Sequence, residues 1–178
     1  MLLEGKVAVI YGAGGNVGGA VARAFGQEGA RVFLAGRTLP ALERLASELP
    51  AGAGIAQVDA LDAGGVDRHA DAVVAAAGSI DISFNLISHA FVQGTPRVEM
   101  SPRDYVDPVL TTVRSTFLTA RAAARHMISR RSGVILFFGG RPIRPEAPTS
   151  GASRWRCTRS RPCAGNWPRS SASTACVS

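Results

Sequence analysis

Lysine, aromatic residues and long hydrophobic runs are scarce in this sequence of 178 residues. Lys6 is the only lysine, and aromatic residues make up 6% of the chain. The longest apolar run, Val134 to Phe138 with its neighbours, covers about eight residues, which is too few to cross a bilayer. Glu4 precedes any apolar stretch that could act as a secretory signal. We therefore expect no association with membranes and a cytoplasmic location.

Cysteine is absent from the first 156 residues of the chain. The three cysteines that follow contain no C-x-x-C pair, and the histidines lie far upstream of them. These spacings argue against a disulfide framework and against a zinc site, so we expect no metal. The residues concerned are Cys157, Cys163 and Cys176, and His69, His89 and His126.

Acidic residues are absent from position 153 onward, where positive charge is concentrated. The chain carries a net charge of +7, and five arginines in this final segment leave only +2 for residues 1–152. That body has no basic stripe with interleaved aromatic residues, so nucleic-acid binding is not expected. The final segment also holds both tryptophans and shows no apolar period. We therefore divide the chain into a folded domain over 1–152 and an irregular Arg/Cys/Trp-rich tail over 153–178.

Predicted strands and helices alternate along residues 1–152. Hydrophobic residues make up 46% of the whole chain, which is enough for a substantial core. Such alternation specifies an α/β fold, a doubly wound parallel sheet of the Rossmann type in a single domain. The apolar patterns predict strands over 7–10, 31–35, 54–58, 80–87 and 133–138. They predict helices over 16–29, 39–49, 62–77 with its start delayed by two glycines, and from a cap at 101 to about 130.

A glycine-rich turn joins the first predicted strand to the first helix. Glycine lets the main chain turn tightly and approach a ligand, and the free N–H groups of the helix's first turn can face a pyrophosphate. The flanking strand and helix favour a dinucleotide site over the alternative, a flexible glycine-rich loop. A strict G-x-G-x-x-G is not present, because valine stands at the position of its last glycine. The candidate cofactor residues here are Gly12, Gly14, Gly15, Asn16, Val17 and Gly18.

The order of these and later motifs, over roughly residues 5–154, resembles the short-chain dehydrogenase/reductase (SDR) family. The turn resembles the family's T-G-x-x-x-G-x-G, with Tyr11 in place of threonine and Asn16 in place of the middle glycine. Asp59-Ala60 resembles the pair that contacts adenine, although an aspartate that caps the following helix is the alternative. Asn85 is the one residue left of the last four letters in the family's I-D-x-x-x-N-N-A-G segment.

Arg37-Thr38, just after the second strand, occupy the place where the family discriminates between cofactors. No acid is present to accept a hydrogen bond from a ribose 2′-hydroxyl, whereas a guanidinium can pair with a 2′-phosphate. The resemblance therefore implies NADP rather than NAD as the cofactor. A solvated surface arginine without a ligand is the alternative.

The resemblance implies hydride transfer between a nicotinamide and a carbonyl or alcohol carbon, with tyrosine, lysine, serine and asparagine as the catalytic set. The asparagine and serine positions hold Thr112 and Gly140, and the tyrosine and lysine positions hold Ser150 and Arg154. No Tyr-x-x-x-Lys occurs anywhere, because the only lysine lies at position 6. Serine is too weak an acid to replace the phenol, and arginine differs from lysine in geometry and proton affinity. No catalytic site is therefore expected to be intact. His89 has no partner that would make it a substitute.

The tail has the composition of a GC-rich gene read in the wrong frame. The codons for Arg154 to Arg161 can encode an amphipathic helix in a shifted frame, so we expect a truncated or frameshifted family member. Family members are homo-oligomers, and the missing next helix argues against the same assembly here. The expected function is that of an NADP-linked oxidoreductase with impaired activity. The alternatives are a silent nucleotide-binding module, a non-functional truncated product and, less favoured for lack of an acid after the second strand, a methyltransferase.

Overall fold

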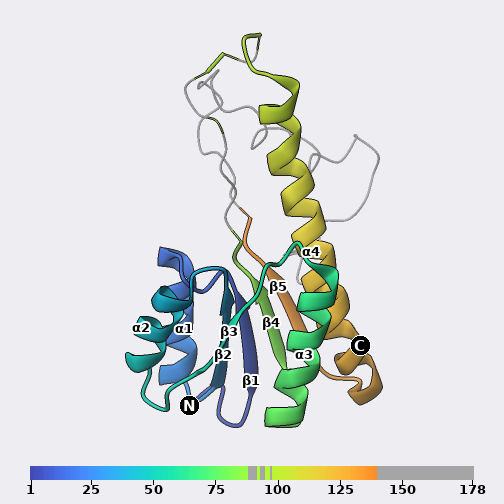
Figure 1. Ribbon diagram of the computed structural model, residues 1–178. Helices are drawn as coiled ribbons and strands as arrows, with labels where there is room; N and C mark the ends of the chain where they lie inside the picture. The colour runs from blue at the N-terminus through green and yellow to red at the C-terminus, as the bar shows by residue number, and fades with distance from the viewer. Residues whose placement is uncertain (88–91, 93–94, 97, 140–178) are drawn as a thin grey trace, which may run out of the picture. The chain divides into compact units, whose positions relative to one another are not determined.

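The computed structural model describes residues 1–87, 92, 95–96 and 98–139. Five strands and four helices alternate along this part of the chain (Figure 1). The strands are β1 (Val7–Tyr11), β2 (Arg31–Gly36), β3 (Gly54–Gln57), β4 (Ile82–Asn85) and β5 (Val134–Phe137). The helices are α1 (Asn16–Gln27), α2 (Leu39–Ser47), α3 (Ala63–Ala77) and α4 (Pro102–Arg130).

The strands form one parallel sheet in the order β3-β2-β1-β4-β5. The chain moves outward from β1 to β3 and then returns to the other side of β1, so the strand order reverses between β1 and β4. This is the switch point at which ligands bind in such sheets. The expected doubly wound parallel α/β fold is therefore confirmed.

The described residues belong to two compact units, which are treated separately. The first contains the sheet, α1, α2, α3 and the part of α4 from Arg114 onward. The second contains the described residues between positions 92 and 113, together with Gly139. None of the helices in the described ranges is long and apolar enough to span a bilayer.

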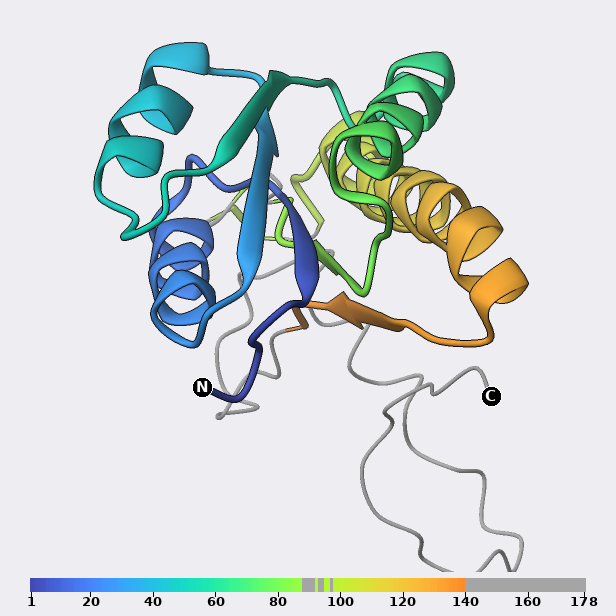
Figure 2. The ribbon, with the colours of Figure 1, turned by 90° about the horizontal axis from the view of Figure 1, so that it is seen from below.

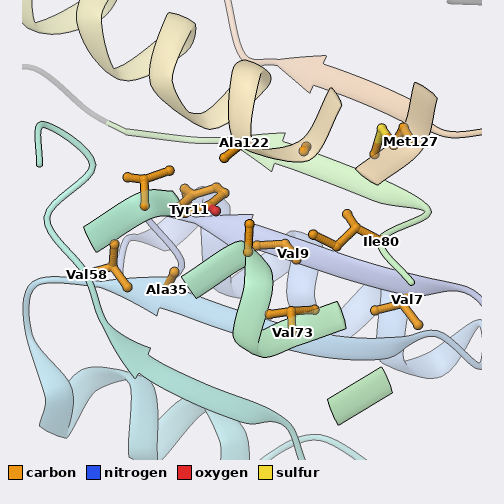
Figure 3. Close-up of a cluster of buried hydrophobic side chains, with 12 residues drawn as sticks. Val7, Val9, Tyr11, Ala35, Val58, Val73, Ile80, Ala122 and Met127 are labelled. Atoms are coloured by element: carbon orange, nitrogen blue, oxygen red, sulfur yellow. The ribbon is translucent and has the colours of Figure 1, made fainter. Parts of the chain in front are cut away.

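Within the first unit, both faces of β1 are buried, as its run of apolar residues predicted. Val7, Val9 and Tyr11 pack on the face covered by α3 and α4, where Ala122 and Met127 also lie (Figure 3). The other face packs against α1 and α2 through a second cluster that includes the other two residues of β1. Figure 2 shows these two helix layers on opposite sides of the sheet.

Element boundaries differ from the expected ones where side chains take over backbone hydrogen bonds. Helix α3 begins at Ala63, before the two glycines that were expected to delay it, because the Asp62 carboxylate accepts the Gly64 amide at 3.1 Å and caps the helix. Strand β4 ends at Asn85, two residues early, because its side-chain oxygen accepts the Ile87 amide at 2.9 Å. Ser101 caps α4 as expected, accepting the Asp104 amide at 3.1 Å.

Asp81, which is buried just before β4, links β1, β5 and α4 at the amino end of the sheet through its side chain and main chain. Its Oδ2 accepts the Val7 amide at 2.9 Å and the Ser79 hydroxyl at 3.2 Å, and its Oδ1 accepts Arg130 Nη2 at 3.2 Å. Its own amide donates to Val7, and its carbonyl accepts the Val134 amide. Burial opposes ionisation of this group, but these hydrogen bonds outweigh burial and lower the pKa of Asp81.

His69 of α3 and Tyr11, the last residue of β1, form a buried polar pair. The His69 Nδ1 and the Tyr11 hydroxyl are 3.3 Å apart, and the two rings meet edge to face. Burial lowers the pKa of His69 to about 4. Burial, together with the charge of Asp67, raises the pKa of Tyr11. Both groups are therefore neutral in the folded protein near pH 7.

We predict that His69 makes the fold sensitive to mild acid. Because folding lowers the pKa of His69 from 6.5 to about 4, the unfolded chain binds this proton first, and the unfolding free energy falls as the pH decreases from 6.5 towards 4. The loss reaches about 3 kcal/mol. Urea unfolding followed by circular dichroism across this range measures it, and His69→Gln should flatten the dependence. An equally steep dependence in His69→Gln would contradict the prediction.

Candidate functional site

The glycine turn lies at the carboxyl ends of the strands, at the switch point between β1 and β4. Gly12 has a φ of 80°, and a Cβ there would lie 2.7 Å from the Leu86 carbonyl oxygen. A Cβ on Gly18 would lie 2.5 Å from the Gly12 carbonyl oxygen. These two positions therefore require glycine, because the strand, the turn and the helix approach one another too closely for any side chain.

The other two glycines of the turn are not required by packing. A Cβ on Gly14 would meet Ala41 Cβ at 3.4 Å, and one on Gly15 would meet the Gly12 carbonyl oxygen at 3.6 Å, which are tolerable contacts. Residues 14–17 are instead exposed at the end of the sheet. Glycines here leave this surface open to a ligand.

The amino end of α1 provides donors for an anion. Gly15 is its N-cap and has no side chain with which to satisfy the first amides, and the first turn contains no acidic residue. The amides of Asn16, Val17 and Gly18 have no acceptors inside the helix. A cradle that excludes Cβ atoms, next to uncommitted amides and the positive end of a helix dipole, fits a pyrophosphate.

Arg37 and Thr38 form the whole connection between β2 and α2. Arg37 is exposed, and its guanidinium makes no ion pair with any of the described residues. Thr38 is the N-cap of α2, but its side chain makes no capping hydrogen bond. The Gln57 side chain donates from Nε2 to the Arg37 carbonyl oxygen at 2.9 Å. A guanidinium and a hydroxyl are therefore placed one strand away from the glycine turn.

Asp59 and Ala60 follow β3. Asp59 is exposed, and its Oδ1 accepts the Leu61 amide at 2.9 Å, whereas Ala60 is buried. The N-cap of the following helix is Asp62. The alternative role considered for Asp59, that of capping α3, therefore belongs to a different aspartate.

Asn85 is buried at the end of β4 and shapes the main chain beside the turn. Its Oδ1 accepts the Ile87 amide, and its Nδ2 donates to Thr119 Oγ1 at 3.1 Å. Thr119 in turn donates to the Ser115 carbonyl oxygen at 2.8 Å. Both ends of the Asn85 amide thus form hydrogen bonds within the protein, and its Oδ1 holds the main chain next to Leu86, against which Gly12 packs.

Sequence reasoning did not identify Thr119 or Gln57 as part of this region. Thr119 lies inside a long helix and Gln57 at a strand end, and neither has a motif around it. The sequence of β3, Gly-Ile-Ala-Gln, has no polar and apolar alternation, so no signal in the sequence marked Gln57.

Of the four positions that the sequence assigns to the expected catalytic set, the structure describes Thr112. Its hydroxyl donates to the Pro108 carbonyl oxygen at 2.7 Å within α4. Gly140, Ser150 and Arg154 lie outside the described residues, as do His89 and the tail over 153–178. Across the described ranges, no three His, Cys, Asp or Glu side chains gather in a way that could hold a metal ion.

Comparisons with known proteins agree with this geometry. The model of the short chain dehydrogenase family matches residues 6–140. D-threitol dehydrogenase of Mycolicibacterium smegmatis is 33% identical over 137 residues, which are 75% of this chain and 52% of that protein. Sorbitol dehydrogenase of Cereibacter sphaeroides is 36% identical over 134 residues, which are 75% of this chain and 51% of that protein. The chain spans about half the length of these relatives.

Solved structures give the same result for the fold. A metagenomic short-chain oxidoreductase in complex with NADP superposes with a TM-score of 0.75 at 28% identity, covering 89% of this chain and 74% of that one. A short-chain type dehydrogenase/reductase from Mycobacterium marinum gives 0.74 at 29% identity, with coverages of 85% and 64%. The glycine turn, the sheet order and these matches together show that the chain belongs to the short-chain dehydrogenase family of oxidoreductases.

Proposed function

We propose that this protein descends from NADP-dependent oxidoreductases of the family and still binds NADP. We further propose that its hydride transfer on a carbonyl or alcohol substrate is impaired. The observation that supports binding is the cradle in which Gly12 and Gly18 pack without room for a Cβ. Such close packing has no use in a merely flexible loop. It holds the exposed residues 14–17 beside the start of α1.

Each part of the dinucleotide has a proposed partner. The main chain of residues 14–18 would hold the pyrophosphate, and Arg37 with Thr38 would hold the 2′-phosphate. Asp59 and Ala60 would contact adenine, and the main chain shaped by Asn85 would border the ribose. When bound, the cofactor supplies a hydride donor or acceptor at its nicotinamide.

The chain offers no phenol to complete the chemistry. Family catalysis needs a tyrosine whose pKa is lowered by a neighbouring lysine, and the chain has only two tyrosines and one lysine. Tyr11 is buried against His69, and burial raises its pKa, which is the opposite of what a proton donor near neutral pH requires. Tyr105 lies in the first turn of α4 without any lysine on that helix. A catalytically silent nucleotide-binding protein is therefore the alternative form of the proposal.

The proposal extends to the cell and to assembly. We place the protein in the cytoplasm, with a dinucleotide as its small-molecule partner. Family oligomers use the long helix, on which Phe117 is 60% exposed. This exposed apolar surface is expected to favour non-family association over the usual homo-oligomer.

The first prediction from this proposal concerns cofactor preference. Isothermal titration calorimetry should show tighter binding of NADPH than of NADH. Arg37→Ala should weaken NADPH binding about tenfold, because it removes a charge-assisted hydrogen bond to the 2′-phosphate, and should leave NADH binding unchanged. Arg44→Ala is the matched control, since Arg44 is also exposed but lies in the last turn of α2. Equal losses in both variants would refute the assignment of Arg37.

The second prediction concerns turnover. NADPH oxidation, followed by absorbance with a panel of ketones and aldehydes, should remain at the rate without protein, because the phenol and the ammonium group are missing. Binding without turnover supports the silent form of the proposal. Measurable turnover that scales with protein concentration would show that another group supplies the proton.

The third prediction concerns the tail over 153–178. We propose that this segment is read out of frame, which is supported by its change of composition and by a family match that ends at residue 140. The nucleotide sequence of the gene should encode, in a shifted frame after codon 153, an apolar-periodic helix followed by a strand. The idea fails if neither alternative frame does so.

A further inference from the structure

The connection between β2 and α2 is short and is fixed at both ends. The Gly36 carbonyl oxygen, at the end of β2, accepts the Val58 amide at 2.9 Å. The Thr38 carbonyl oxygen, at the start of α2, accepts the amides of Ala41 at 3.2 Å and Leu42 at 3.4 Å. Only Arg37 lies between these two anchored carbonyls, so the direction of its side chain depends on its own peptide group.

That peptide group is held by a side chain from the neighbouring strand. Gln57 is the last residue of β3 and pairs in register with Gly36. Its Nε2 donates to the Arg37 carbonyl oxygen at 2.9 Å. Both residues are exposed, and the bond lies just beyond the last hydrogen bond of the ladder, which runs from the Val58 amide to the Gly36 carbonyl oxygen. It is therefore a local restraint on the Arg37 peptide and adds little to the core.

The chemistry of the bond suits a neutral amide. The Arg37 carbonyl needs a donor, and a lysine or arginine at position 57 would add a second cation, whereas a carboxylate would repel the carbonyl and neutralise the guanidinium. Glutamine supplies the donor without changing the charge. Arg37 thus keeps its full positive charge for an anion, since its guanidinium makes no ion pair with the described residues.

We propose that Gln57 is a positioning residue for cofactor selectivity: by holding the Arg37 carbonyl, it directs the Arg37 side chain towards the 2′-phosphate that distinguishes NADP from NAD. The inference rests on the proposed binding of NADP. The restraint fixes the main chain from which the Arg37 side chain extends, so less main-chain conformational entropy is lost on binding. Because only NADP carries the 2′-phosphate, the Gln57 hydrogen bond raises the affinity for NADPH and does not change the affinity for NADH.

Calorimetric titration of the full chain with NADPH and with NADH tests the proposal. Gln57→Met keeps the length of the side chain and removes its donor, and it should weaken NADPH binding about threefold to fivefold with no change for NADH. Gln57→Ala removes the same donor with a smaller side chain and should act in the same direction. Gln27→Met is the matched control, because Gln27 is exposed at the end of α1 and should change neither affinity.

A double-mutant cycle separates positioning from a general structural effect. In the Arg37→Ala background, Gln57→Met should no longer change NADPH binding, because nothing remains to be positioned. Equal weakening of NADPH and NADH, or an undiminished effect without Arg37, would overturn the proposal. So would an unchanged NADPH preference in Gln57→Met, and in that case the proposed function stands. If the unaltered protein does not prefer NADPH, the proposed function and this inference both fail.

Discussion

The close approach of β1, β4 and α1 at Gly12 is the constraint on which the cofactor end of this fold depends. Gly12 donates to the Ala35 carbonyl oxygen of β2 at 2.8 Å, while its Cα faces the main chain at Leu86 without room for a Cβ. The Leu86 amide donates to the Tyr11 carbonyl oxygen at 2.9 Å. Three strand ends therefore meet at one residue, and the direction of α1 follows from this meeting. A Cβ at this point would separate the strands at the place proposed for the dinucleotide.

The contacts around that point form a continuous support from the core to the surface. Asn85 fixes the main chain against which Gly12 packs, and Thr119 of α4 holds Asn85 from below. At the opposite end of the sheet, the Asp81 carboxylate links β1 to Arg130 of the same helix. The first unit therefore uses α4 at both ends of β4. Neither Thr119 nor Asp81 contacts a ligand site directly, yet both set where the strand ends lie.

The fold could be predicted from the sequence, because alternating apolar runs and helical periods leave few arrangements other than a parallel sheet. The glycine positions of the site were also predictable, since Gly12 and Gly18 match a motif whose spacing reflects their packing. Element ends were less predictable: the Asp62 cap starts α3 early, and the Asn85 side chain ends β4 early. Gln57 was missed because the role proposed for it depends on its register with Gly36, and strand pairing across a sheet is not visible in a single sequence.

The proposed separation between a cofactor cradle that is kept and a catalytic set that is replaced has a physical reason. Pyrophosphate recognition uses main-chain amides and the absence of Cβ atoms, so it tolerates changes such as Asn16 for glycine, provided that Gly12 and Gly18 remain. Proton transfer instead needs one phenol with a lowered pKa, and no other side chain of similar size supplies it. Tyr11 illustrates the difference, because its phenol is buried in the core, where it packs against His69. A chain can therefore lose its chemistry by a few substitutions and still present the same backbone to a nucleotide.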